Sequence, residues 1–482
     1  MAMGTYEIVM GLEIHVELAT RSKIFCGCST EFGGAPNSHV CEICSGMPGT
    51  LPALNRRVVE YAIRAGLATN CEIARNTQFD RKNYFYPDLP KAYQVSQLYL
   101  PICRSGYVNI PGTGEKKRIG IREIHMEEDA GKLIHDPDDD CTLVDYNRCG
   151  VPLIEIVTDP DFRDAGEVVA FLEKIKSILQ YLGVSDCKME EGSMRADINL
   201  SARSFGSSKL GTRTEMKNMA SLKAIADAIE GESKRQIDFL EKGGVIVQET
   251  RRWDESKGRS TAMRSKEDAH DYKYFPEPDL VPIRISDSQI EKERKNLPEL
   301  PEAKKRRYMG EYGLPEYDAD ILTGSRYLVN VFERAVDICR NPKDASNWIM
   351  TDLLMLLREA RTEPEEMCFS PDSLGVIISM VNEGKINRNV GRQVLSAVFS
   401  EDVDPEAYVE KNGLSQISDA DSIEPIIRAV LRENENAVSE FLGGRQKNFQ
   451  FLVGQSMKAL KGKADPQVVR SSLEKMLKGL QD

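Results

Sequence analysis

Residues 11–18, which read Gly-Leu-Glu-Ile-His-Val-Glu-Leu, decide how the first half of the chain is interpreted. Apolar and polar side chains alternate along this stretch. One face would carry Ile14, Val16 and Leu18, and the other Glu13, His15 and Glu17. A period of two is typical of a β-strand that packs one face against a core. We therefore expect a strand whose second face presents carboxylates and an imidazole.

The sequence around this strand, residues 1–290, mixes strand-like and helical patterns. Strand-like runs lie at 118–128, 151–157 and 195–200, and helical patterns at 56–67, 165–182 and 221–242. Strands and helices do not alternate regularly, which favours an α+β fold over a doubly wound parallel sheet. Residues 1–290 are therefore predicted to form an α+β domain.

The remaining sequence is predicted to be helical. Beyond the prolines at 276, 278 and 282, amphipathic patterns appear at 327–340, 345–361, 373–382 and 387–399. Short helices with brief turns predict a helical bundle over residues 291–405. Residues 401–440 hold eleven acidic and three basic residues, whereas 441–482 hold three acidic and eight basic. We expect an all-α tail domain at 406–482, whose basic charge is either a solvated face or a local RNA contact.

The bulk composition is that of a globular protein of roughly two to four domains. The chain has 482 residues, of which 41% are hydrophobic and 29% charged. Its net charge of −12 makes it a poor general binder of nucleic acid, so any RNA contact should be local. It contains no run of about 18 apolar residues and no signal-peptide pattern, and we expect a cytoplasmic protein.

Four of the eleven cysteines form two close pairs, Cys26-Gly-Cys28 and Cys41-Glu-Ile-Cys44. Two such pairs can place four thiolates tetrahedrally around one Zn²⁺ ion. With four protein ligands the site would be closed to substrate and purely structural. The alternatives are four ordinary thiols or redox chemistry, although no thioredoxin-like pattern surrounds the pairs.

Carboxylates cluster near two of the five histidines. His15 lies in the strand above, and His125 lies in the run Glu-Ile-His-Met-Glu-Glu-Asp at 123–129. Glu155 sits within the apolar run Val-Pro-Leu-Ile-Glu-Ile-Val, where an ionised carboxylate costs several kcal/mol unless it is paired or bound to metal. Oxygen ligands with one imidazole suit Mg²⁺ or Mn²⁺ better than Zn²⁺. Spacing leaves open whether these groups converge or are separate structural residues.

Residues 79–97 are dense in tyrosine, lysine and amide side chains, including Lys82 and Tyr84. We expect an ordered loop that could stack a base and hold phosphates, or else an irregular surface loop. Two strand-like segments carry exposed polar alternation that resembles the wall of a polar cavity: Arg195, Asp197 and Asn199 on the first, and Glu215 and Lys217 on the second. The sequence contains no Walker A motif, so ATP, if bound, is held in another way.

These motifs, in order along the whole chain, resemble the B subunits of tRNA-dependent amidotransferases. The resemblance lies in 10–18, the cysteine pairs, 80–88, 145–157, 194–199, 217–221, 264–279 and 451–458. Lys273 stands where the family usually has arginine, and the family's basic tail loop corresponds to Gly-Gly-Arg-Gln-Lys at 443–447.

The resemblance implies a protein that uses ATP to phosphorylate the side-chain carboxylate of misacylated Asp-tRNA(Asn) or Glu-tRNA(Gln). Ammonia then displaces the phosphate and gives Asn-tRNA(Asn) or Gln-tRNA(Gln). The resemblance also implies a heterotrimer with an amidase A subunit and a small C subunit. The expected architecture is an α+β cradle with a zinc knob, a helical domain and a tail that grips tRNA. Two rival interpretations are an RNA-binding scaffold with a structural zinc and a self-contained ATP-dependent ligase.

The resemblance further implies roles for individual residues. His15, Glu128 and Glu155 match a Mg²⁺ site, with Glu13 beside it. The resemblance also implies a polar cavity that would serve ATP, the aminoacyl end or ammonia. Its residues would be Lys82, Tyr84, Asp197, Glu215 and Lys217, and Asn199 would also contact the nucleotide. The structural Zn²⁺ ligands would be Cys26, Cys28, Cys41 and Cys44.

Overall fold

The computed structural model describes residues 5–112, 114–135, 141–265, 272–416, 420–460, 464 and 466–479. The chain divides into two compact units, Met1–Leu300 and Pro301–Asp482. The first unit extends past the predicted boundary at 290 because Ile290, Leu297 and Leu300 pack on its core. Within the described residues, every helix is too short or too polar to span a lipid bilayer.

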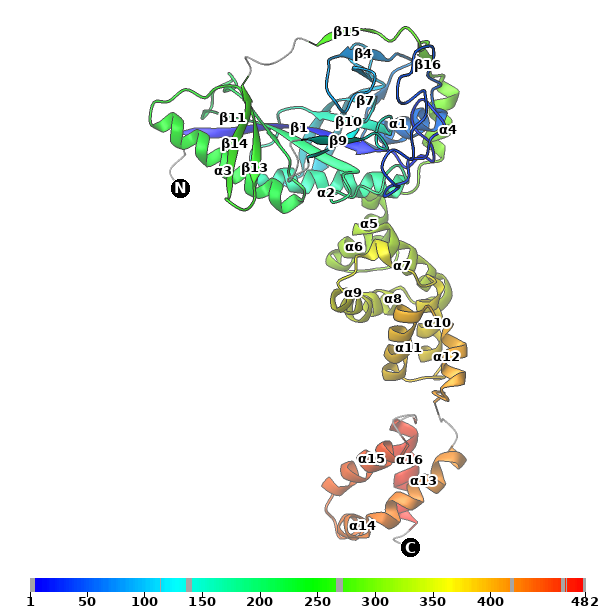
Figure 1. Ribbon diagram of the computed structural model, residues 1–482. Coiled ribbons are helices and arrows are strands. Elements are labelled where there is room, and N and C mark those ends of the chain that lie inside the picture. The colour runs from blue at the N-terminus through cyan, green and yellow to red at the C-terminus, as the bar shows by residue number, and fades with distance from the viewer. Residues whose placement is uncertain are drawn as a thin grey trace. The chain divides into compact units, whose positions relative to one another are not determined.

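A nine-stranded sheet forms the centre of the first unit (Figure 1). Its strands run in the order β14-β13-β12-β11-β1-β10-β7-β6-β2. Their bounds are β1 Tyr6–Glu17, β2 Glu72–Ile73, β6 Cys103–Ile110, β7 Lys117–Glu128, β10 Pro152–Thr158, β11 Met194–Ser204, β12 Thr214–Lys217, β13 Glu249–Asp254 and β14 Arg259–Ser265. All neighbours pair antiparallel except β12 and β13. The predicted strand at 11–18 is confirmed up to Glu17, and it lies in the middle of the sheet.

Three helices cover the apolar face of this sheet: α1 Arg56–Ala68, α2 Ala165–Leu182 and α3 Leu222–Glu241. Leu12, Ile14 and Val16 point into this layer and are almost completely buried. Asp164 and Ser221 cap the N-termini of α2 and α3 by accepting backbone hydrogen bonds, which fixes where each helix begins. The alternation of β1 therefore sends its polar side chains to the face without helices.

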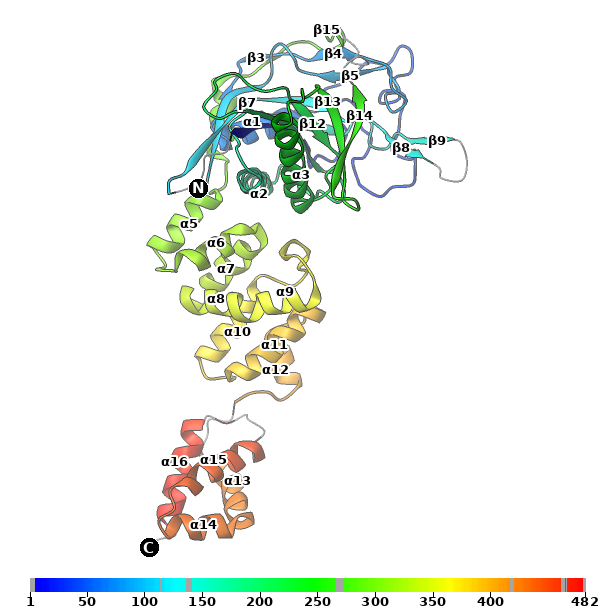
Figure 2. The same ribbon diagram turned by 90° about the vertical axis from the view of Figure 1, so that its left-hand side faces the viewer.

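A three-stranded sheet, ordered β15-β4-β5, lies on the other side of the large sheet from α2 and α3 (Figures 1 and 2). Its strands are β4 Asp80–Asn83, β5 Tyr93–Ser96 and β15 Lys273–Pro276. The interpretation of residues 79–97 as a loop was therefore partly wrong, since two short strands flank a loop. Arg81 clamps β4 through two hydrogen bonds of 2.6 and 2.7 Å to the buried Glu277. Residues 266–271 of the motif at 264–279 lie outside the described residues.

Two two-stranded sheets and one helix complete the first unit. They are β3 Asn76–Thr77 with β16 Ile283–Arg284, β8 Lys132–His135 with β9 Thr142–Asp145, and α4 Asp287–Lys295. Helix α4 begins at a capping box formed by Ser286 and Gln289, and it packs against α1.

The second unit consists of helices in its described residues. These helices form two apolar cores. The first core is shared by α5 Pro301–Gly310, α6 Glu316–Gly324, α7 Arg326–Cys339, α8 Pro342–Trp348, α9 Leu354–Ala360, α10 Asp372–Asn382, α11 Arg388–Glu401 and α12 Pro405–Lys411. The second core is shared by α13 Ala420–Glu433, α14 Glu435–Leu442, α15 Lys447–Ala459 and α16 Pro466–Lys478. A π-helical turn at Ile349–Leu353 joins α8 to α9, and a 3₁₀ turn lies at Pro364–Glu366. The helical character predicted for this half is confirmed, while the domain boundary at 405 stays a prediction.

Glu232 on α3 ties this helix to the edge of the large sheet. Its fully buried carboxylate accepts hydrogen bonds from Thr214 and Ser260 at 2.9 Å each and pairs with Arg235 at 2.6 Å. Arg251 lies 3.4 Å away. Removing this carboxylate takes the closest anion away from Arg235 and leaves the buried donors of Thr214 and Gln236 without this acceptor.

We expect Glu232→Ala to lower the free energy of unfolding by about 3 kcal/mol, because it breaks a buried ion pair and leaves buried hydrogen-bond donors without their acceptor. Urea unfolding followed by tryptophan fluorescence measures this change. Glu230→Ala, at an exposed position of the same helix, is the matched control and should change it by less than about 0.5 kcal/mol. Equal effects of the two substitutions would contradict the structural role of Glu232.

Candidate active site

Strand register places a row of ionisable side chains on the polar face of the large sheet. His15 on β1 is directly opposite Glu155 on β10, and Glu155 is directly opposite His125 on β7. Side chains at directly opposed positions share a face, as do residues two apart along a strand. Glu127 therefore lies on this same face, next to His125.

These side chains converge in the structure. The Nε2 atom of His15 is 3.4 Å from Glu127 Oε1 and 3.4 Å from Glu155 Oε2. The candidate ligand atoms of His15, Glu127 and Glu155 all lie within 4.8 Å of one another. We call these three residues the His15 group.

Glu128 does not belong to the His15 group, and this expectation is corrected. Adjacent residues of a strand point to opposite faces, so Glu127 and Glu128 cannot both face His15. The Glu128 carboxylate instead receives two hydrogen bonds from Lys91 Nζ at 2.5 and 2.7 Å and one from Val95 N at 2.9 Å. Glu127 takes the position predicted for Glu128.

Electrostatics within the His15 group are dominated by burial and mutual charge. Burial would lower the pKa of His15, but hydrogen bonding and attraction from Glu155 and Glu127 raise it to about 9. Burial also opposes ionisation of Glu155, yet His125 and His15 hold its pKa well below the usual value. The pKa of Glu127 is raised by burial and by repulsion from Glu155. The group thus brings two carboxylates close together, and His15 and His125 stabilise the charge of Glu155.

Aromatic and basic side chains from the small sheet lie close to this group. Lys82 Nζ sits 5.3 Å from the ring centroid of Tyr84 and 4.7 Å from that of Tyr272. Burial, followed by nearby carboxylates including Glu127, raises the pKa of Tyr84 and Tyr274. The predicted site residues Lys82 and Tyr84 both interact electrostatically with Glu127 of the His15 group.

A second acidic group occupies the same sheet face one strand further along. The carboxylates of Glu13, Asp197 and Glu215 also lie within 4.8 Å of one another. Lys217 Nζ donates to Asp197 at 2.6 Å and lies 2.9 Å from Glu215, and Asn199 donates to Glu13 at 3.0 Å. Burial and repulsion from Glu155 and Glu215 raise the pKa of Glu13. The predicted cavity residues of β11 and β12, namely Asp197, Asn199, Glu215 and Lys217, thus share one face with Glu13.

The His15 group has the donor set that a hard divalent cation needs. It offers one imidazole nitrogen and oxygens from two carboxylates. Oxygen-rich sites with one imidazole suit Mg²⁺ or Mn²⁺. These residues therefore fit the metal that the sequence implies.

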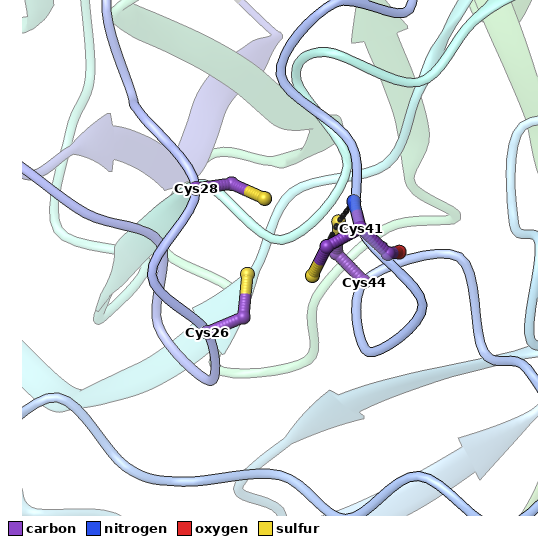
Figure 3. A group of neighbouring side chains, drawn as sticks. All are labelled: Cys26, Cys28, Cys41 and Cys44. Atoms are coloured by element: carbon purple, nitrogen blue, oxygen red, sulfur yellow. Dashed lines mark hydrogen bonds between the residues drawn. The ribbon is translucent and has the colours of Figure 1, made fainter.

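The four predicted cysteines come together from two loops, and their sulfur atoms face a common space (Figure 3). Cys41 N donates to Cys44 Sγ at 3.2 Å. A hydrogen bond from Cys26 lowers the pKa of the Cys44 thiol. The fully buried Lys23 directs Nζ to 3.7 Å from Cys44 Sγ, which places a positive charge beside the sulfur cluster. Four thiols in one place with a neighbouring cation fit a tetrahedral metal–thiolate centre.

Comparison with known proteins assigns the family. Residues 8–291 match the family model of the GatB/GatE catalytic domain, and residues 330–477 match that of the GatB domain. The chain belongs to the GatB family. It is 60% identical to the B subunit of the aspartyl/glutamyl-tRNA(Asn/Gln) amidotransferase of Lachnoclostridium phytofermentans, over 98% of this chain and 99% of that protein. Proteins of the same name from Caldicellulosiruptor saccharolyticus and Thermoanaerobacter sp. are 56% and 53% identical, each over 98% of this chain and 99% of theirs.

The GatB catalytic domain match, residues 8–291, contains both the sheet face and the cysteine cluster. Three residues near these sites were missed by sequence reasoning: Glu127, Lys91 and Lys23. Strand alternation counted from His125 could have selected Glu127 over Glu128. Nothing in the sequence signals that Lys23 is buried or that Lys91 pairs with Glu128, because lysine is usually exposed.

Proposed function

We propose that this GatB-family chain is the B subunit of an ATP-dependent, tRNA-dependent amidotransferase that converts Asp-tRNA(Asn) or Glu-tRNA(Gln) to Asn-tRNA(Asn) or Gln-tRNA(Gln). Similarity along nearly the whole chain to proteins of that name supports the reaction. The location of the active site is inferred from the His15 group, which lies inside the segment that matches the catalytic domain.

The chemistry follows from the substrate. A carboxylate is a poor electrophile, so an oxygen of the aminoacyl side chain first attacks the γ-phosphorus of ATP, and ADP leaves. Ammonia then attacks the acyl carbon, inorganic phosphate leaves with the C–O electron pair, and the amide nitrogen loses a proton. Mg²⁺, when bound, neutralises charge between the nucleotide and the carboxylate.

The residues of the sheet face have distinct proposed roles. His15, Glu127 and Glu155 would hold Mg²⁺. Lys82 and Tyr84 lie where they can contact phosphate oxygens or the aminoacyl end, since both are close to Glu127. The second group, Glu13, Asp197, Asn199, Glu215 and Lys217, would contact the nucleotide or guide ammonia, because it offers both donors and acceptors along one polar wall.

The cysteine cluster would hold a structural Zn²⁺ in a knob on an α+β cradle. A heterotrimer is part of the proposal, with an amidase A subunit that supplies ammonia and a small C subunit. The basic helices α15 and α16 of the tail would contact tRNA, since they end in Lys458, Lys475 and Lys478.

Reconstitution tests the reaction. The chain is combined with A and C subunits, ATP, Mg²⁺, glutamine and each misacylated tRNA in turn, and the aminoacyl group is identified by mass spectrometry after deacylation. We expect Asn or Gln on the tRNA only when ATP and this chain are both present. A non-enzymatic RNA-binding scaffold would bind tRNA and yield no amidated product, and that result would refute the proposal.

A further inference from the structure

His125 is a buried histidine that the His15 group does not include. Only 7% of its surface is exposed, and it lies on β7, between β10 and β6. A buried histidine is often a core residue whose hydrogen bonds are satisfied. His125 differs from such a residue because three carboxylates face its ring.

The two ring nitrogens of His125 have unequal partners. Nε2 is 3.1 Å from Glu155 Oε2, within hydrogen-bond distance, and 3.9 Å from Glu127 Oε2. Nδ1 is 3.6 Å from Glu123 Oε1, and among the described residues this buried atom has no hydrogen-bond partner. Nε2 therefore makes the short contact, and it makes it with a carboxylate of the His15 group.

We infer that His125 is a positioning residue, whose Nε2–H donates to Glu155 and fixes that carboxylate for binding a divalent cation. The inference rests on the proposed function, in which Glu155 is a metal ligand. A carboxylate on a strand retains free torsions, and the hydrogen bond removes them before the metal arrives. Groups that orient metal ligands in this way typically contribute about 10- to 100-fold to metal affinity.

Two substitutions separate the role of Nε2 from that of the ring. The amide nitrogen of His125→Gln can reach the position of Nε2, whereas the amide nitrogen of His125→Asn reaches only that of Nδ1, towards Glu123. Both variants replace the imidazole with a neutral, polar side chain that has donor and acceptor atoms. A difference between them therefore reports on the donor to Glu155 and not on loss of the ring.

The test is isothermal titration of the assembled complex with Mn²⁺ in the absence of nucleotide. We expect His125→Asn to weaken Mn²⁺ binding about 10- to 100-fold, and His125→Gln to stay within about threefold of the wild type. The Mg²⁺ concentration that gives half-maximal amidation should shift in parallel, with little change in the rate at saturating Mg²⁺. Thermal unfolding of both variants provides the check that they are folded.

The outcomes distinguish this inference from the proposed function. His15→Ala serves as the reference for loss of the site. Suppose that His15→Ala weakens Mn²⁺ binding. If the two His125 variants then both bind Mn²⁺ like the wild type, or both lose affinity to the same extent, the positioning role of His125 is refuted and the proposed metal site is retained. If His15→Ala leaves Mn²⁺ binding unchanged, the metal site of the proposed function itself fails.

Discussion

Glu127→Gln is expected to reduce ATP-dependent amidation of misacylated tRNA by about 100-fold or more, with glutamine hydrolysis by the A subunit retained. Gln keeps the size of the side chain and removes the negative charge beside His15 and Glu155. Loss of one preorganised electrostatic contact to the reacting groups typically costs about 10²–10³ in rate. The measurement is single-turnover amidation of purified Asp-tRNA or Glu-tRNA over a range of Mg²⁺ concentrations. The Mg²⁺ requirement should rise as the rate falls.

Two comparisons decide whether this effect belongs to Glu127. Glu173→Gln changes an exposed carboxylate on α2, on the other face of the sheet, and should leave amidation unchanged. Glu128→Gln alters the pair with Lys91, so it should affect stability without shifting the Mg²⁺ requirement. A shift in the Mg²⁺ requirement with Glu128→Gln and none with Glu127→Gln would reverse the assignment made from the structure.

The Glu127–Glu128 correction shows what strand patterns can and cannot predict. Alternation in residues 11–18 correctly predicted that Glu13, His15 and Glu17 share the face opposite the apolar core. It carries no information on which strands pair, because the register between β1, β10 and β7 is set by contacts far apart in sequence. The convergence of His15 with Glu155 therefore required the structure.

The small sheet was harder to predict for a different reason. Strands β4 and β15 are only four residues long, and Asn83 at the end of β4 is 190 residues before Lys273 at the start of β15. The ion pair between Arg81 and Glu277, which are also remote in sequence, accompanies this pairing. Propensity in so short a segment is weak, and tertiary contacts override it. The chemical character of residues 79–97 was nevertheless informative, since Lys82 and Tyr84 lie beside the His15 group.

For the cysteine cluster, unlike the small sheet, the spacing in the sequence was sufficient to predict that each pair of cysteines lies together. Each pair is closed by a turn of one or two residues, so local geometry alone brings two sulfur atoms together. Only the meeting of the two pairs depends on the fold. Beyond the sequence pattern, the structure adds the buried Lys23 and the close approach of the segment that carries Cys41 and Cys44 to Lys91, where a Cβ atom on Gly46 would collide with Lys91 Cγ. The segment that carries Cys41 and Cys44 therefore packs directly against the lysine that pairs with Glu128.

Cys41→Ser is accordingly expected to remove zinc and to disturb the region around Lys91. Structural zinc sites supply about 10–16 kcal/mol of binding free energy, so one ligand of four corresponds to roughly 3 kcal/mol, or about 100-fold or more in zinc affinity. We expect zinc content to fall from about one ion per chain to almost none after dialysis against a weak chelator. The thermal unfolding midpoint should fall by several degrees. Zinc content is measured by inductively coupled plasma mass spectrometry and stability by calorimetry.

Cys368→Ser is the matched control for this prediction, because Cys368 is exposed and lies outside the cluster. It should leave both zinc content and the unfolding midpoint unchanged. Because the segment that carries Cys41 and Cys44 contacts Lys91, loss of zinc should also slow amidation without shifting the Mg²⁺ requirement, which distinguishes Cys41→Ser from Glu127→Gln. Full zinc content in Cys41→Ser, or equal loss in both cysteine variants, would show that the four thiols do not form one metal centre.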